Sequence, residues 1–238
     1  MLNVKNLSTL YSPKTIHDLV VNNKEIKGYL NDVVNGHASS NLLLNGTNGT
    51  GKSTIARLIP ILIEGYDPWS ERLQGSASFC EKDAIAKLQT VEGIAKIVGQ
   101  KYYYIIFDEI DKVKDNLANF WQLLDSWSSD VMVIATSNDY MNIDKCLRSR
   151  FKTITFDPVK AIDFLPRAMF IFQNENVMLQ EVFILSELQK VENLADIRKY
   201  MEAVKDIYRN HLNGRIGAEN YVDGIKPPTS PHSTLVLT

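Results

Sequence analysis

The sequence predicts an α/β protein in which a central parallel sheet is flanked by helices and followed by a small all-helical lid domain. A glycine-rich loop, Gly46 to Ser53, follows the apolar run 41–44 and precedes a helical stretch. Two further apolar runs, 102–107 and 131–135, lack alternation, as expected of strands buried on both faces. Beyond residue 157, apolar positions recur at helical spacing.

The composition is that of an ordinary folded protein without a strong charge bias. The chain has 238 residues, 45% hydrophobic and 23% charged, with a formal net charge of −2. It is long enough to bury a sizeable core, and its charge creates no global attraction to nucleic acid. Cys80 and Cys146 are too few for a disulfide framework. Since no apolar run reaches the ~20 residues of a membrane helix, we expect no membrane partner and a cytoplasmic location, or a nuclear one in a eukaryote.

The glycine-rich loop predicts a binding site for a nucleoside triphosphate. It fits the pattern G-x-x-x-x-G-K-[ST] at every position. Its residues are Gly46, Thr47, Asn48, Gly49, Thr50, Gly51, Lys52 and Ser53. Glycine lets backbone N–H groups approach phosphate oxygens closely, and the next helix directs its positive end at the anion. Lys52 would contact the β- and γ-phosphates and Ser53 would bind Mg²⁺. An ordinary turn between strand and helix is the alternative interpretation.

An acidic pair, Asp108 and Glu109, directly follows the apolar run 102–107. Ligands of open parallel sheets bind beyond the carboxyl ends of the strands, so this pair can meet the glycine-rich loop. Asp108 would hold Mg²⁺ through its water shell, and Glu109 would orient and deprotonate the water that attacks the γ-phosphate. Without the loop, the pair would indicate only a solvated strand end.

Polar residues near two later strands extend this candidate site. Asn138 follows the run 131–135, where its amide can contact the γ-phosphate or the attacking water, although Ser-Asn-Asp is also turn chemistry. Arg148 and Arg150 precede the apolar run 153–156 and have no evident partner. An arginine at a subunit edge can neutralise transition-state charge on a neighbour's phosphate, although such a pair is more often solvated.

In chain order these motifs resemble the AAA+ ATPases, and among them the small ATPase subunits of sliding-clamp loaders. Gly46 to Thr54 is similar to the Walker A motif, 105–111 to the Walker B motif and Asn138 to sensor 1. The resemblance implies a P-loop NTPase fold with ATP and Mg²⁺ as cofactors. It also implies that Thr54 binds the nucleotide and that Ser53 and Asp108 hold the metal.

The segment 10–20 looks like the N-terminal signature of this family, which reads Tyr-Arg-Pro-Lys-Thr, with Ser12 in place of the arginine. In the family this segment packs beside the adenine. The resemblance therefore implies that Tyr11 contributes to nucleotide binding, with Val20 and Val21 as apolar neighbours of the base.

Two arginine motifs of the family also have counterparts. Ser149-Arg150-Phe151 looks like the Ser-Arg-Cys motif of clamp loaders, which implies that Arg150 acts in catalysis across a subunit interface; Phe151 departs from the cysteine and is closer to the wider AAA+ pattern. The segment 195–199 resembles the sensor 2 sequence Gly-Asp-Leu-Arg-Lys, so Arg198 would reach the γ-phosphate in cis. Alternatively, Asp196 caps a helix and Arg198 is solvated.

The predicted domain boundaries are an α/β nucleotide-binding domain at 1–157, a helical lid at 158–212 and a flexible tail at 213–238. Asp157-Pro158 is typical of a helix start, and Pro166 should kink or break the helix expected over 159–173. Further helices are expected over 179–191 and around Ile197, Met201, Val204 and Tyr208. The tail composition suits a linker and not the helical collar that clamp-loader subunits carry after the lid.

Two classes of function fit these observations. In the first, the chain is an ATP-hydrolysing motor subunit that forms a ring or spiral with other AAA+ subunits and acts on a sliding clamp and primer–template DNA. In the second, it is a AAA+ remodeller or loader that acts on a protein partner, such as a helicase, a transposase or a defence complex. A non-hydrolysing scaffold and a small-molecule kinase fit less well, since Glu109 and Arg150 are both present.

Overall fold

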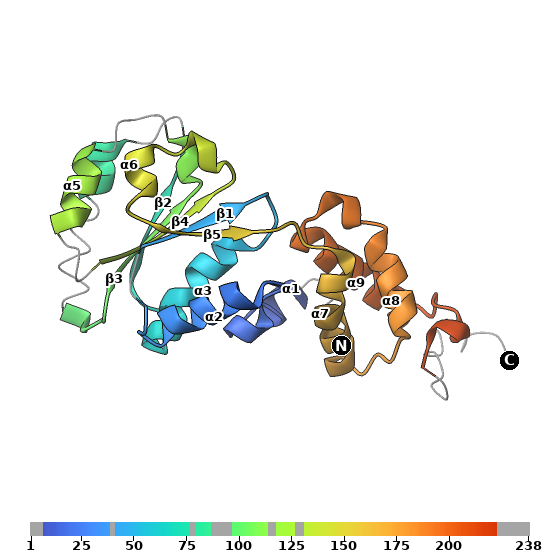
Figure 1. Ribbon diagram of the computed structural model, residues 1–238. Helices are drawn as coiled ribbons and strands as arrows, with labels where there is room; N and C mark the ends of the chain where they lie inside the picture. Colours follow the sequence, from blue (N-terminus) through green and yellow to red (C-terminus); the bar gives the residue numbers. More distant parts are fainter. Residues whose placement is uncertain are drawn as a thin grey trace, which may run out of the picture. The chain divides into compact units, whose positions relative to one another are not determined.

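The computed structural model describes residues 7–38, 41–76, 80–86, 97–113, 118–126 and 131–222. The chain divides into two compact units. The α/β unit is Pro13–Asp157, and the helical unit combines Met1–Ser12 with Pro158–Thr238 (Figure 1). Among the described residues, no helix is both long and apolar enough to cross a membrane.

The described part of the α/β unit contains a five-stranded sheet in the order β2-β3-β4-β1-β5. All neighbouring strands run parallel, as the sequence predicts. The strands are β1 (Leu42–Gly46), β2 (Ser70–Gln74), β3 (Tyr103–Asp108), β4 (Val131–Ser137) and β5 (Lys152–Phe156). The edge strand β2 is not predicted by the sequence, because its polar residues Ser70, Glu71 and Arg72 form no apolar run.

The register of the sheet brings three strand ends to one edge. Asn45 of β1 pairs with Ser137 of β4, and Phe107 of β3 pairs with Ala135 of β4. The loop after β1, the acidic pair after β3 and the turn after β4 therefore begin side by side. This is the edge at which open parallel sheets bind their ligands.

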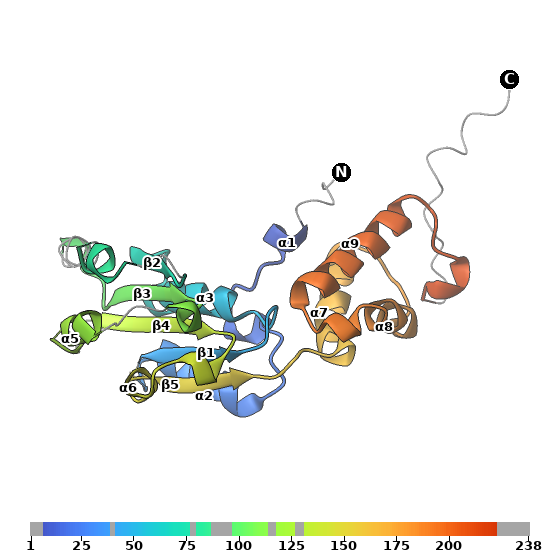
Figure 2. The same cartoon turned by 90° about the horizontal axis from the view of Figure 1, so that it is seen from above.

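Helices cover both faces of the sheet (Figures 1 and 2). The helices α2 (Lys24–Val34) and α3 (Lys52–Glu64) join one buried cluster, for example through Leu30 and Ile55. The helices α5 (Ala118–Ser126) and α6 (Lys145–Arg148) join the other through Trp121 and Leu147. Alternate strand residues point to opposite faces, so Leu42 and Leu43 lie in different clusters, and β1, β3 and β4 are apolar without alternation.

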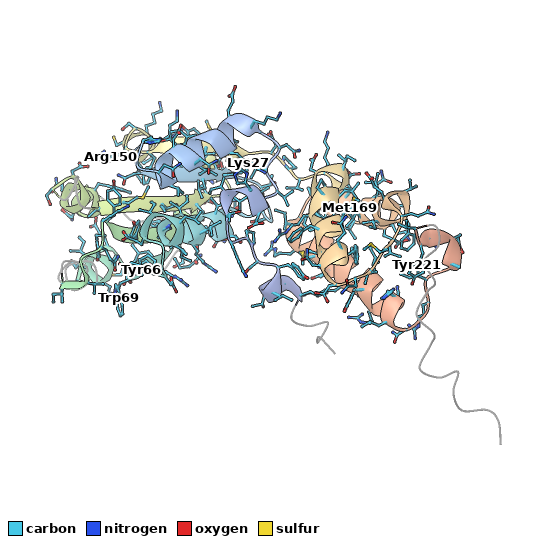
Figure 3. All side chains as sticks on the ribbon, turned by 90° about the horizontal axis from the view of Figure 1, so that it is seen from below. Lys27, Tyr66, Trp69, Arg150, Met169 and Tyr221 are labelled. Carbon is cyan, nitrogen blue, oxygen red and sulfur yellow. The ribbon has the colours of Figure 1, made fainter. Side chains whose placement is uncertain are left out.

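The helical unit contains α1 (Leu7–Leu10), α7 (Ala161–Asn174), α8 (Glu181–Gln189) and α9 (Ile197–Leu212). The predicted helix start at Asp157-Pro158 is wrong: α7 begins at Ala161, where the Asp163 carboxylate accepts the Lys160 N–H at 3.0 Å. Pro166 lies inside α7 and does not end it. Figure 3 labels Met169 on this helix.

Short 3₁₀ helices also occur in both units. They are η2 (Ile16–Asp18), η3 (Ile110–Lys112), η4 (Tyr140–Asn142), η5 (Glu192–Leu194) and η6 (Ala218–Asn220).

The grouping of Leu7–Ser12 with the C-terminal helices differs from the predicted domain 1–157. Its physical reason is a polar contact network around Glu175. The Tyr11 hydroxyl donates to one carboxylate oxygen of Glu175 at 2.6 Å, and the Tyr208 hydroxyl donates to the other at 3.2 Å. Arg167 donates to the Tyr11 carbonyl at 2.7 Å. These contacts join the N-terminal segment to α7 and α9.

The residues directly after α9 also differ from the predicted tail at 213–238. Tyr221 is buried, forms an isolated antiparallel bridge with Leu179, and its hydroxyl lies 3.0 Å from Nδ1 of His211 (labelled in Figure 3). Gln180 donates its N–H to the Asn220 carbonyl at 2.9 Å. The helical unit therefore continues to residue 222, and the rest of the predicted tail, 223–238, lies outside the described residues.

Ala195 has a backbone conformation that glycine would adopt more easily. It follows η5 with φ of +47°, and the next residue, Asp196, is the N-cap of α9. Left-handed backbone costs an L-residue with a Cβ about 1–2 kcal/mol. The sensor 2 sequence that this segment resembles has glycine at the same position.

We predict that Ala195→Gly raises the free energy of unfolding by up to about 1 kcal/mol, because glycine removes this steric cost. Equilibrium unfolding in urea measures the change. Ala203→Gly, in the middle of α9, is the matched control and should lower the free energy of unfolding by about 1 kcal/mol. Equal destabilisation by both substitutions would show that the conformation of Ala195 carries no cost.

Candidate functional site

The glycine-rich loop lies between β1 and α3 and requires glycine at two points for different reasons. Gly46 has φ of +148°, and a Cβ there would lie 2.5 Å from the Phe156 carbonyl oxygen of the neighbouring strand. Gly51 has φ of +88° and is the N-cap of α3. Since the first N–H groups of a helix have no partner within it, the loop and α3 together present an array of donors to an anion.

Lys52 is folded onto the loop. It is only 7% exposed, and its ammonium donates to the carbonyls of Gly46 at 2.8 Å and Thr47 at 2.6 Å. Thr50 is also buried, while Thr47, Asn48 and Thr54 are exposed. Ser53 and Thr54 lie in the first turn of α3. The positive charge is thus already positioned at the loop that the sequence assigns to phosphates.

Asp108 lies at the end of β3 and contacts two other elements. Its Oδ1 accepts the Thr136 hydroxyl proton at 3.0 Å, and its Oδ2 lies 3.8 Å from the Arg57 guanidinium. Arg57 is four residues after Ser53 on α3, so both side chains lie on the same face of that helix. The structure therefore brings Asp108 to the side of α3 that carries Ser53.

Glu109 has an unusual backbone, and one oxygen of its carboxylate has two partners. Its φ is +57°, and its N–H donates to the Thr136 hydroxyl at 3.0 Å. One carboxylate oxygen accepts from the Gln74 amide at 2.7 Å and from the Lys112 ammonium at 2.8 Å. The Glu109 side chain remains 31% exposed, so these partners can be exchanged for water or ligand.

Asn138 directly follows β4 and is partly buried. Its N–H donates to Oδ1 of Asp111 at 3.1 Å, which ties the turn after β4 to η3. The pairing of β3 with β4 places this turn beside the acidic pair. The structure therefore brings the glycine-rich loop, Asp108, Glu109 and Asn138 to one edge of the sheet.

Arg150 is paired with an acidic side chain, so the prediction that it lacks a partner is wrong. The Arg150 guanidinium makes a two-pronged contact with the Asp125 carboxylate on α5, with distances of 2.9–3.2 Å, and donates to the Cys146 carbonyl at 2.8 Å. This hydrogen bonding lowers the pKa of Asp125 and raises the pKa of Arg150. The Arg148 guanidinium lies 4.7 Å from the centre of the Tyr140 ring. Figure 3 labels Arg150 at the outside of the α/β unit.

Val20 and Val21 follow η2 in the α/β unit and are both partly buried. Val21 packs against the cluster that contains Ile55 and Ile59 of α3. Both valines therefore belong to the same unit as the glycine-rich loop, and Val21 packs against an apolar cluster to which α3 contributes.

Tyr11 and Arg198 belong to the helical unit. Burial and the hydrogen bond to Glu175 raise the pKa of Tyr11 to about 12, so this hydroxyl stays protonated at neutral pH. Arg198 forms a two-pronged ion pair with Asp196, with a shortest distance of 2.7 Å, and its side chain is 72% exposed. Asp196 also accepts the Arg198 N–H at 2.8 Å, as the N-cap interpretation requires.

The candidate ligands for a metal are few, as is usual for Mg²⁺. The described residues contain no group of three or more His, Cys, Asp or Glu side chains that could hold an ion. Mg²⁺ commonly takes only one or two protein ligands and completes its shell with phosphate oxygens and waters. The Ser53 hydroxyl and the Asp108 carboxylate fit that donor set.

Sequence reasoning missed Gln74, Lys112 and Thr136 at this edge of the sheet. It also missed Asp125, the partner of Arg150. Thr136 could have been noticed because it is a polar residue near the end of a buried strand, two residues before Asn138. Gln74 and Asp125 give no local signal, since their partners are 35 and 25 residues away along the chain.

Residues 42–159 match the ATPase family associated with various cellular activities (AAA). The matched segment contains β1 to β5 and every candidate residue of the sheet edge. It therefore covers the part of the chain in which the structure assembles the site.

Curated relatives extend the similarity beyond this segment. A sliding-clamp-loader large subunit of Enterobacteria phage T4 is 23% identical over 202 residues, which cover 81% of this chain and 61% of the relative. Replication factor C small subunit 2 of Pyrobaculum islandicum is 24% identical, covering 82% and 61%. Replication factor C small subunit of Methanococcus maripaludis is 26% identical, covering 92% and 71%. The chain thus spans about three fifths of the length of the first two.

Solved structures of RuvB mutants from Thermotoga maritima share the fold. One superposes with a TM-score of 0.64 at 15% identity, covering 83% of this chain and 66% of that chain. Another gives a TM-score of 0.65 at 14% identity, covering 85% and 66%. At such identities the likeness concerns the fold alone.

Proposed function

We propose that this chain, an AAA+ ATPase similar in sequence to the subunits of sliding-clamp loaders, binds Mg-ATP at the carboxyl edge of its sheet and hydrolyses it. One observation supports this above all others. Lys52 follows β1 and the acidic pair Asp108 and Glu109 follows the apolar part of β3, the two strands that flank β4 in one parallel sheet, and Asp108 is close to the Ser53 face of α3. ATP hydrolysis requires this combination of a cation for phosphate, a metal ligand and a base.

The loop residues bind the triphosphate by exchanging contacts. Lys52 gives up the carbonyls of Gly46 and Thr47 for β- and γ-phosphate oxygens, and the N–H groups at the start of α3 donate to the same anion. Gly46 lets the start of the loop lie against β5, since a Cβ there would collide with the Phe156 carbonyl. Ser53 and Asp108 would hold Mg²⁺, which supplies charge neutralisation between the phosphates when it is bound.

Glu109 is the base in this proposal. Its carboxylate leaves Gln74 and Lys112 to accept a proton from the attacking water, and the Asn138 amide helps to hold that water or the γ-phosphate. Because the phosphoryl transition state is loose, orientation of the water matters more than strong basicity.

Further residues complete the proposed site. Arg150 leaves Asp125 to contact the γ-phosphate bound by a neighbouring subunit, and Arg198 leaves Asp196 to contact the γ-phosphate of its own subunit. Both pairs are exposed, and exposed ion pairs contribute only about 0–1 kcal/mol, so exchange costs little. Tyr11, Val20 and Val21 are proposed neighbours of the adenine.

At the level of the assembly, we propose a motor subunit that works in a ring or spiral of AAA+ subunits. Its partners would be a sliding clamp and primer–template DNA. The names of the T4 and archaeal relatives support this choice. A remodeller acting on a protein partner is the alternative that the tests below distinguish.

We predict that Glu109→Gln lowers the ATPase turnover number at least roughly 100-fold, because the amide cannot accept the proton of the attacking water. The dissociation constant for Mg-ATP should stay within about threefold of wild type. Steady-state phosphate release and equilibrium binding of a fluorescent ATP analogue measure the two quantities. Glu202→Gln, which removes a charge from exposed α9, is the matched control. Wild-type turnover by Glu109→Gln would exclude Glu109 as the base.

We predict that Arg150→Ala loses roughly 10³-fold in turnover and regains activity when mixed with Glu109→Gln, although each variant alone is inactive. In the mixture, an intact Glu109 can stand beside a neighbour's intact Arg150. Phosphate release as a function of mixing ratio measures the recovery. Mixing Arg150→Ala with the double variant Glu109→Gln/Arg150→Ala is the control. Absence of recovery in mixed assemblies, detected by sedimentation, would contradict action in trans.

We predict that primer–template DNA together with a sliding clamp from the same source stimulates wild-type ATPase several-fold, since a clamp loader couples hydrolysis to that complex. The ATPase rate is measured with the clamp, with primed DNA, and with both. Single-stranded DNA of equal length is the control for nonspecific binding. An active ATPase that responds to none of these additions would favour the remodeller instead.

A further inference from the structure

We infer that Thr136 is a positioning residue that fixes the backbone of Glu109 and links it to Asp108 by hydrogen bonds. This inference rests on the proposed ATPase function. Thr136 lies on β4, is only 2% exposed and makes two hydrogen bonds of 3.0 Å. One joins it to the proposed metal ligand and the other to the proposed base.

The direction of these hydrogen bonds follows from the chemistry of the groups. The Glu109 backbone N–H can only donate, so the Thr136 oxygen accepts from it. An ionised Asp108 carboxylate can only accept, so the single hydroxyl proton of Thr136 points to Asp108. The resulting series of hydrogen bonds runs from the Glu109 N–H through Thr136 to Asp108. Each hydrogen bond polarises the next, and the charged Asp108 carboxylate that accepts the last one strengthens both.

These hydrogen bonds hold the backbone of Glu109 in a conformation that would otherwise relax. Glu109 has φ of +57°, a left-handed conformation that is strained for a residue with a side chain. The Gly75 backbone lies so near the Glu109 carbonyl that a Cβ on Gly75 would be 1.9 Å from that oxygen. Gly75 donates its N–H to the Asp108 carbonyl at 2.7 Å. The Asp108–Glu109 peptide group is therefore held on both sides, at its carbonyl by Gly75 and at its N–H by Thr136.

The carboxylate of Glu109, by contrast, is held only through partners on the partly exposed side of the site. Gln74 and Lys112 can release it without disturbing the main chain. The carboxylate of Glu109 can therefore change partners while Thr136 holds the backbone to which it is attached. A displacement of a catalytic group by about 1 Å can cost roughly 100-fold in rate. Loss of the Thr136 hydrogen bond should therefore lower the turnover number and not the affinity for nucleotide.

The test compares Thr136→Val, which keeps the shape and removes the hydroxyl, with Thr136→Ser, which keeps the hydroxyl. Thr153→Val on β5 is the matched control for a valine introduced into the same sheet. For each purified full-length variant, the turnover number, the KM for Mg-ATP, the dissociation constant of a fluorescent ATP analogue and the thermal midpoint are measured. Glu109→Gln is measured in parallel.

Thr136→Val should lose roughly 10- to 100-fold in turnover, with a nucleotide dissociation constant within about threefold of wild type. Thr136→Ser should restore turnover to within about threefold, and Thr153→Val should behave as wild type. The inference is overturned if Thr136→Val keeps wild-type turnover, if its nucleotide affinity falls in step with turnover, or if Thr136→Ser gives no rescue. The thermal midpoint separates these outcomes from unfolding.

The two proposals fail in different ways. A wild-type protein without Glu109-dependent ATPase contradicts the proposed function, and the positioning role falls with it. A wild-type protein with Glu109-dependent ATPase that survives Thr136→Val contradicts the positioning role alone.

Discussion

The candidate site depends on the parallel pairing of β1, β3 and β4. Each strand is apolar along its length and buried on both faces, so a slip of one residue would move large side chains into the wrong cluster. The register is therefore held by packing, and it brings the loop after β1, the acidic pair after β3 and the turn after β4 to one edge. Three segments that are far apart along the chain become neighbours without any direct affinity between them.

The charged side chains of the candidate site share a second property: in the described structure each has a protein partner. Lys52 contacts loop carbonyls, Glu109 contacts Gln74 and Lys112, Arg150 contacts Asp125 and Arg198 contacts Asp196. The last two pairs are exposed, and such pairs add little to stability. Side chains held in this way are ordered before a ligand arrives and can exchange their protein partner for the ligand. This order lowers the entropy cost of forming the bound state.

The helical unit is held by contacts of a different kind. Tyr11 and Tyr208 share the carboxylate of Glu175, and burial raises the pKa of both tyrosines. Because a partly buried carboxylate is stabilised by its hydrogen bonds, this network helps to attach Leu7–Ser12 to α7 and α9. The N-terminal segment therefore belongs to the C-terminal helices although it opens the chain.

The sequence by itself determined the features whose residues are contiguous. The loop, the four apolar strands, the acidic pair and the cap of α9 each depend on neighbours in the chain, so local pattern and propensity were enough to predict them. Tertiary structure decided the rest. Strand β2 carries no apolar run, α7 takes its start at Ala161 and not at Asp157, and Leu7–Ser12 pack with distant helices. Gln74 and Thr136, which contact Glu109, and Asp125, which contacts Arg150, come from segments 25 to 35 residues away. Such contacts follow from strand register and helix packing, which no single stretch of sequence encodes.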